Sequence, residues 1–190
     1  MGRTSIRLGS VAALMMLMAM SPVLAGELAL SSPDIAEQRS IPETFINNSG
    51  GGCGGGNLSP ALQWRGAPAT TKSYALTVYD PDALTGSGWW HWVLYNIPAS
   101  ADRLARGAGD PARSLLPTGA VQGRTDFGTA GYGGPCPPRG NRPHHYIFTI
   151  FALDIDALPV KSGATAAMVG AAIYSHRLAE AKLTAIYGRY

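Results

Sequence analysis

Short runs of β-branched and aromatic residues, separated by clusters of glycine and proline, make up most of the chain. These runs read GELALSS, ALQW, SYALTVYD, HWVLYNIP and HHYIFTIFALD. Short strand-like runs between turn residues predict a mainly β fold of the sandwich type. The last run, from His144 to Asp154, is apolar on both faces, so we expect both of its faces to be buried.

The pattern changes its period near the C-terminus. After Thr165, apolar residues recur at three- and four-residue spacing: Ala167, Met168, Ala171, Ala172, Leu178, Ala179, Leu183 and Ile186. This spacing predicts an amphipathic C-terminal helix that Thr165 caps, broken in two near Gly170 or the YSH segment. We expect the helix to cover a face or an edge of the sheet. Its polar side carries too little basic charge to favour membrane binding.

The first 25 residues have the pattern of a secretory signal peptide. Arg3 and Arg7 precede the apolar run Val11 to Met20, and Val23 and Ala25 occupy the small-residue positions of a cleavage site. A membrane span needs about 20 apolar residues, so this run is short for one. We therefore expect a signal peptide over residues 1–25, a mature domain over 26–190 without a transmembrane anchor, and a location in the periplasm or outside the cell. An uncleaved anchor is the alternative.

Composition narrows the class of protein further. A chain of 190 residues favours a single domain. The net charge is +3, but Arg3 and Arg7 belong to the expected signal, and no basic stripe indicates a nucleic-acid partner. The two cysteines, Cys53 and Cys136, predict a disulfide in an exported protein. Two free thiols are the alternative, and a metal site built on two distant cysteines alone has little support.

One candidate site follows from the stretch LTVYDPDALTGSGWWHWVLYNIP. Pro81 cannot continue a central strand, so Asp80 and Asp82 are expected at a strand end. Strands that follow one another in this way often pair, which would bring both aspartates near His91. In the second strand, a period of two places His91 on one face with Val93 and Tyr95.

A second group of candidates lies in GGPCPPRGNRPHHYIF. Its glycine and proline residues predict a rigid loop before a strand. On that strand His144 and Tyr146 share a face, whereas His145 points to the other, which counts against a metal site built on the two histidines. We expect His144 to line the site and Asp80 to face it.

Aspartate, histidine and tyrosine around one pocket can bind a phosphate group or a carboxylate, or act in general acid–base chemistry. The sequence has no G-x-S-x-G nucleophile and no H-E-x-x-H metal helix. We therefore expect that the protein is not an enzyme and that it binds no metal and no cofactor. Taken singly, each residue also fits a purely structural role. D-P-D is a common turn sequence, and His91 among tryptophans is typical of a histidine in the core.

Taken together, the motifs resemble the phosphatidylethanolamine-binding protein family, also called the Raf kinase inhibitor protein family, in its bacterial exported branch. The resemblance rests on GGNLSPALQW, YDPDA, GWWHWVLYNIP, DFGTAGYGGPCPPRG, HHYIFTIFALD and the closing LAEAKLTAIYGRY, which resembles the family's last helix. It implies a β-sandwich with a few peripheral helices and a small anion-binding pocket at one end. By motif, the pocket residues would be Asp80, Asp82, His91, Gly134, Pro135, His144 and Tyr146. Cys53 and Cys136 lie next to these motifs, as in exported relatives with a disulfide there.

One departure concerns the edge of this pocket. The family usually continues D-P-D-A-P, and here Leu84 stands in place of the proline, which gives a looser and more apolar rim. The resemblance implies a regulatory module that binds a small anionic or phosphorylated ligand. A protein that inhibits a partner, such as a protease or kinase, and a hydrolase that uses Asp80 with His91 are the alternatives.

Overall fold

The computed structural model describes residues 1–2, 27–48, 50–161 and 163–190. The predicted signal peptide lies outside these ranges, apart from its first two residues. In the described part of the chain, the candidate strands are confirmed as β1 (Ala29–Ser31), β2 (Leu62–Arg65), β3 (Ser73–Asp80), β4 (Trp89–Pro98) and β7 (His144–Leu153). Between Asp102 and Pro143 only short elements form: β5 (Arg103–Leu104), the 3-10 helix η2 (Pro111–Arg113) and β6 (Val121–Gln122). Another 3-10 helix, η1, covers Glu43–Phe45.

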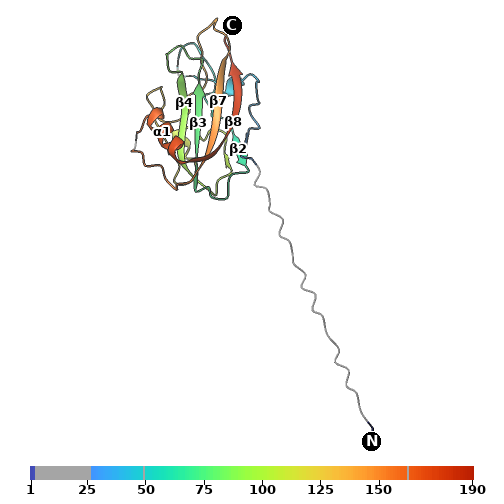
Figure 1. Cartoon of the computed structure of the whole chain (residues 1–190). Coiled ribbons are helices and arrows are strands. Elements are labelled where there is room, and N and C mark those ends of the chain that lie inside the picture. Colours follow the sequence, from blue (N-terminus) through green and yellow to red (C-terminus); the bar gives the residue numbers. More distant parts are fainter. Residues whose placement is uncertain (3–26, 49, 162) are drawn as a thin grey trace.

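Two antiparallel sheets form the sandwich, as the hydrophobic pattern predicts. The small sheet has the strand order β1-β2-β5, and the large sheet has the order β6-β4-β3-β7-β8 (Figure 1). The main core lies against one face of the large sheet and includes Trp64 of β2, Trp92 of β4 and Phe148 of β7. Burial of these large side chains provides the main driving force for folding.

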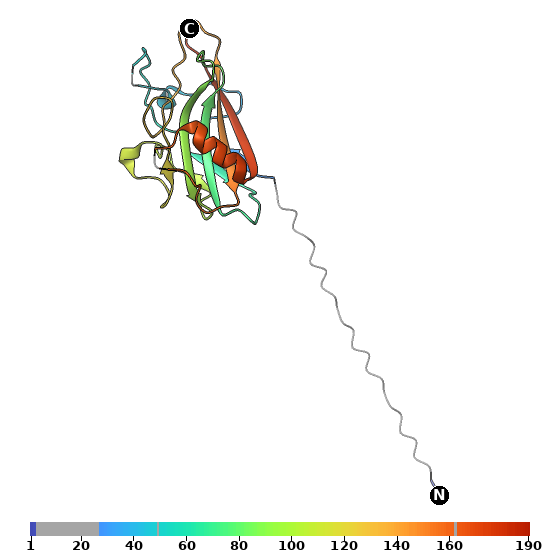
Figure 2. The same cartoon turned by 60° about the vertical axis from the view of Figure 1, so that its left-hand side comes forward.

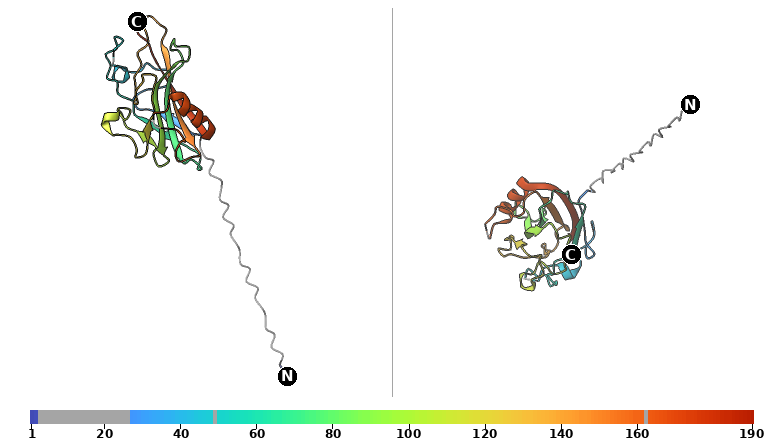
Figure 3. Two further views of the ribbon diagram at one scale, coloured as in Figure 1. Left: turned by 90° about the vertical axis from the view of Figure 1, so that its left-hand side faces the viewer. Right: turned by 90° about the horizontal axis from the view of Figure 1, so that it is seen from below.

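A helix packs on the opposite face of the large sheet. This is α1 (Ala166–His176), and Figure 2 shows it lying across the strands. Val169 and Ile173 of α1 form a second buried cluster with Val93 and Leu153 of the sheet. β7 is therefore buried on both faces toward its C-terminal end, whereas His145 near its start is exposed, so the expectation is confirmed only in part. Viewed from the side, the segment with η2 lies away from α1, across the strands (Figure 3).

The C-terminal prediction is confirmed only in its first half. The Thr165 side chain accepts a hydrogen bond from the backbone N–H of Met168, as a helix N-cap does. The helix ends at His176, however, and Arg177–Tyr187 forms the strand β8. The prediction of a closing helix is wrong there, and Leu183, Ala185 and Tyr187 instead alternate toward the core. The reason is tertiary pairing, because β8 pairs with β7 from His144–Tyr187 to Leu153–Arg177.

Candidate functional site

The candidate site lies where β3 ends and where β4 and β7 begin. Antiparallel pairing places Asp80 opposite Trp89, and Tyr79 opposite Ile147. A pocket of about 320 Å³ opens at this point, which we call the inner pocket. Its lining residues are Asp80, Ala83, Leu84, Thr85, Trp89, His91, Phe127, Cys136, Pro137, Pro138, His144 and Tyr146. Four of the seven predicted site residues thus lie together: Asp80, His91, His144 and Tyr146.

Asp80 and His144 form a buried pair in the inner pocket. The carboxylate Oδ2 of Asp80 lies 2.8 Å from Nδ1 of His144, and the two side chains are about 5% exposed or less. The other carboxylate oxygen, Oδ1, accepts the backbone N–H of Asp82 at 2.8 Å, so the D-P-D turn orients the carboxylate. The expected contact between Asp80 and His144 is confirmed. Because Nδ1 is engaged, Nε2 is the His144 nitrogen available to a ligand.

His91 reaches the pocket through an irregularity in β4. Val78 pairs with Trp92 and Tyr79 with Trp90, so His91 has no partner opposite it and forms a β-bulge. Its ring packs against Tyr146, which belongs to the main core, with centroids 5.1 Å apart. The prediction that His91 shares a face with Val93 and Tyr95 is therefore wrong, because the extra residue interrupts the alternation.

The hydrogen bonds of His91 decide its protonation state. Nδ1 lies 2.6 Å from the carbonyl oxygen of Gly133, which can only accept, so Nδ1 carries a proton. Burial lowers the pKa of His91, although the Gly133 carbonyl opposes this shift. The imidazole is therefore neutral at neutral pH, with a lone pair on Nε2. Asp80 does not orient this ring, so the Asp80–His91 pair on which a hydrolase would depend does not form.

Tyr146 provides a buried hydroxyl that has no hydrogen-bond partner among the described residues. The side chain is 1% exposed and lines the inner pocket. Burial raises the pKa of this phenol, and the charge of Asp80 raises it further, so the hydroxyl stays protonated. The Asp80 carboxylate is the nearby acceptor, but the hydroxyl makes no hydrogen bond of normal geometry with it, so this donor remains open to a ligand.

Asp82 lies outside the inner pocket. Its Oδ2 accepts hydrogen bonds from the backbone N–H of His145 at 2.8 Å and from Nδ1 of the same residue at 2.7 Å. Burial acts to raise the pKa of Asp82, but these hydrogen bonds outweigh it and the pKa is lowered. The structure thus contains two neighbouring aspartate–histidine pairs, and only the Asp80–His144 pair lies in the inner pocket.

Gly134 and Pro135 hold the loop from behind and are not part of the pocket lining. The N–H of Gly134 donates to Oδ1 of Asn57 at 2.8 Å, and the carbonyl of Pro135 accepts from the N–H of Asn47 at 3.0 Å. A Cβ atom on Gly134 would lie 2.3 Å from the carbonyl oxygen of Phe45, so only glycine fits this close approach. The loop then continues into Cys136, Pro137 and Pro138, which do line the pocket.

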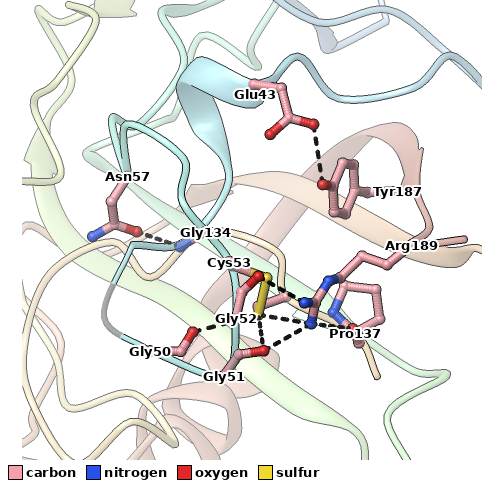
Figure 4. The surroundings of a disulfide bond; sticks show 11 residues. Glu43, Gly50, Gly51, Gly52, Cys53, Asn57, Gly134, Pro137, Tyr187 and Arg189 are labelled. Carbon is pink, nitrogen blue, oxygen red and sulfur yellow. Dashed lines mark hydrogen bonds between the residues drawn. A yellow bond between two sulfur atoms is a disulfide. The ribbon is translucent and has the colours of Figure 1, made fainter. Parts of the chain in front are cut away.

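A disulfide fixes this wall of the pocket. Cys53 and Cys136 are bonded, as predicted, with their Cα atoms 6.0 Å apart. Arg189 lies beside the disulfide in Figure 4, where its guanidinium donates to the carbonyls of Gly51 at 2.9 Å, Gly52 at 2.7 Å and Pro137 at 3.2 Å. The pocket wall is therefore tied to the loop that carries Cys53 by one covalent link and one charged side chain.

Sequence reasoning missed several residues of the site. Phe127 packs edge-on against both His91 and Trp89, with centroids 5.4 Å apart in each case. The DFGT stretch lies in a region without periodicity, which gave no signal that its aromatic ring closes the pocket. Arg189 is a single cation near the C-terminus, and nothing in its neighbours along the chain indicates its role.

The described residues contain no group of three or more histidine, cysteine, aspartate or glutamate side chains placed to hold a metal ion. Within the same ranges, no helix has the length and hydrophobicity needed to cross a membrane.

Comparison with known proteins gives a consistent result. A sequence model described as phosphatidylethanolamine-binding protein matches residues 31–188. The UPF0098 protein YbcL of Escherichia coli is 55% identical over 151 residues, which is 80% of this chain and 81% of YbcL. A crystal structure of E. coli YbcL, described as a new member of the mammalian PEBP family, superposes with a TM-score of 0.84 at 48% identity, covering 87% of this chain and 100% of that one.

Two further proteins widen the comparison. The putative lipoprotein LppC of Mycobacterium tuberculosis is 35% identical over 170 residues, covering 89% of this chain and 77% of LppC. A carboxypeptidase Y inhibitor, solved in complex with its cognate proteinase, superposes with a TM-score of 0.54 over 87% of this chain and 84% of the inhibitor chain. At 18% identity, this last likeness concerns the fold alone.

Proposed function

The chain belongs to the phosphatidylethanolamine-binding protein family, and from this premise we propose that it binds a small phosphorylated or otherwise anionic ligand in the inner pocket. The ligand would lie between Asp80, His91, His144 and Tyr146, under a rim that includes Leu84 and Phe127. We propose a binding and regulatory role without catalysis, because none of these groups is an activated nucleophile.

The unpartnered hydroxyl of Tyr146 carries this proposal. A buried polar group without a partner costs about 1–3 kcal/mol, and a phenylalanine would fill the same space without that cost. A ligand oxygen in the inner pocket would accept this hydrogen bond and remove the cost. An anionic oxygen would profit most, because hydrogen bonds to charged acceptors are stronger than neutral ones.

The protonation of His91 also favours an anionic ligand. In the free protein, burial keeps the ring neutral, so Nε2 cannot donate. A bound anion would favour the imidazolium, whose Nε2–H could then donate to a ligand oxygen. We therefore expect binding to take up a proton and affinity to increase as the pH falls toward the ordinary pKa of histidine.

We also propose that the protein acts outside the cytoplasm. The N-terminal segment has the pattern of a secretory signal, and the Cys53–Cys136 disulfide is typical of oxidising compartments. The name of its relative LppC, a putative lipoprotein, is consistent with export. The periplasm or the exterior of the cell is the proposed location.

A second candidate function is the inhibition of a partner protein. Leu84 is 85% exposed at the rim of the inner pocket, where an apolar side chain could contact a protein surface. The carboxypeptidase Y inhibitor offers a precedent on this fold. Retention of a partner from periplasmic extract by the wild-type protein, and its loss in Leu84→Asp, would favour this function.

The test of the ligand proposal compares two buried tyrosines. Inorganic phosphate would be titrated by calorimetry into protein purified in phosphate-free buffer, for the wild type, Tyr146→Phe and Tyr95→Phe. Tyr95 is buried in the cluster beneath α1 and does not line the pocket. We expect Tyr146→Phe to weaken binding about 10-fold, which corresponds to about 1.4 kcal/mol, while the stability of the free protein is kept or raised by about 1 kcal/mol.

The control variant, Tyr95→Phe, should bind phosphate like the wild type. Equal affinity of the wild type and Tyr146→Phe would contradict the proposed role of this hydroxyl. No binding of phosphate at millimolar concentration, together with no co-purified anion in native mass spectra, would favour the protein-partner function instead.

A further inference from the structure

A second, larger hollow of about 660 Å³ opens beside the inner pocket, and we call it the outer hollow. Its lining residues are Gln38, Asp82, Leu84, Gly140, Asn141, Arg142, Pro143, His144, His145 and Ile186. The inner pocket and the outer hollow share Leu84 and His144. The two spaces therefore meet at these two side chains, so a ligand that occupied both would pass Leu84.

The two aspartate–histidine pairs are divided between these spaces. Asp80 lines the inner pocket, and Asp82 and His145 line the outer hollow, whereas His144 borders both spaces. Both hydrogen bonds from His145 end on Oδ2 of Asp82, so the negative charge of this carboxylate is already partnered. Because Nδ1 of His145 is engaged, Nε2 is the ring nitrogen available to a ligand.

Arg142 is the arginine that lines the outer hollow. Its side chain is exposed and forms no hydrogen bond or ion pair with any residue in the described ranges. Two other arginines do have protein partners. Arg139 donates to the carbonyl of Tyr190 at 3.0 Å, and Arg189 is held beside the disulfide. The guanidinium of Arg142 thus keeps all its N–H donors for an external group. Guanidinium binds carboxylates and phosphates through two parallel hydrogen bonds, which makes these groups its best partners.

We propose that the outer hollow is a second subsite of the same ligand and that it takes a second anionic group, which Arg142 binds. The ligand class is a small molecule with a phosphoryl group in the inner pocket and a carboxylate or second phosphoryl group in the outer hollow. An uncharged linking segment passes over Leu84, whose side chain is exposed between the two spaces. This inference rests on the proposed function of the inner pocket.

The test uses two ligands that differ in one group. Glycerol 3-phosphate and 3-phosphoglycerate share a three-carbon skeleton and a phosphoryl group, and only the second carries a carboxylate. Their affinities would be measured by calorimetry in about 0.15 M salt, where the Debye length is about 8 Å and distant charges contribute little. The proteins are the wild type, Arg142→Gln and the matched control Arg139→Gln, which removes the same charge from a residue outside both linings.

We expect the wild type to bind 3-phosphoglycerate about 10-fold more tightly than glycerol 3-phosphate, as one charge-assisted contact provides. Arg142→Gln should abolish this preference and leave the affinity for glycerol 3-phosphate unchanged, whereas Arg139→Gln should keep the preference. Equal affinities of the wild type for the two ligands would overturn the second subsite but not the inner pocket. Equal losses in both arginine variants would overturn it too, because they would reflect overall charge. If neither ligand binds the wild type, this inference fails, and the titration with inorganic phosphate decides separately whether the proposed function of the inner pocket fails with it.

Discussion

Removing the Cys53–Cys136 disulfide tests how much of the stability depends on tying the pocket wall to a distant loop. The perturbation is the double variant Cys53→Ser/Cys136→Ser, in which each new side chain has nearly the same volume as the cysteine it replaces. The two cysteines are 83 positions apart in the sequence, so the bond closes a very long loop in the unfolded chain. The chain-entropy relation for such a loop gives about 4.5 kcal/mol of stabilisation at 25 °C.

Most of this effect should arise in the unfolded state. In the folded protein, Arg189 still links Gly51 and Gly52 to Pro137 after the disulfide is removed. The native structure therefore keeps its wall, whereas the unfolded chain gains conformational freedom. We expect the free energy of unfolding to fall by about 4 kcal/mol and the melting temperature to fall by roughly 8–16 °C for a chain of this size.

Urea unfolding, followed by tryptophan fluorescence, measures this loss. The m value should rise in the double variant, because an unfolded chain without the cross-link exposes more surface. The wild type in a reducing buffer is the control and should match the double variant. A loss below about 1 kcal/mol in both would refute the loop-closure argument, since it would mean that the unfolded chain is already compact around this pair.

Two more predictions concern His91 and Gly134. Burial lowers the pKa of His91 below its ordinary value of 6.5, so below that pH the unfolded state binds more protons than the folded state. The free energy of unfolding should therefore decrease as the pH falls. Urea midpoints measured from pH 5 to 8 should show this slope, and the same slope in His91→Gln would contradict the prediction. Gly134→Ala should cost at least about 2 kcal/mol, because its Cβ would overlap the carbonyl of Phe45, whereas Gly54→Ala, with nothing within 4 Å of its Cβ, should be neutral in the same assay.

The sequence predicted the long strands because their signals agree. β3, β4 and β7 are rich in β-branched and aromatic residues and are bounded by glycine or proline, so propensity and turn chemistry point the same way. Period-two alternation placed His144 on a face with Tyr146, and the expectation that Asp80 faces His144 is confirmed, although no pattern in the sequence showed that β3 pairs with β7. The role of these residues in ligand binding stays a prediction.

Two errors show where local patterns lose their information. Leu183 and Ile186 fit a helical spacing, while Leu183, Ala185 and Tyr187 fit a strand equally well, and only the unpaired edge of β7 decides between them. The bulge at His91 likewise depends on register with β3, which no pattern within β4 reveals. Phe127 lines the pocket and Arg189 supports its wall, and both come from segments without periodicity, so only the folded chain identifies them.

The position of the C-terminus has a practical consequence for experiments on this protein. β8 ends at Tyr187 opposite His144, Arg189 supports the pocket wall, and Arg139 binds the carbonyl of Tyr190. The last residues of the chain therefore lie at the same end of the sandwich as the inner pocket and the outer hollow. A purification tag fused after Tyr190, or attachment to a sensor surface through that residue, would crowd both openings. Binding should be measured on protein that carries no tag or attachment after Tyr190.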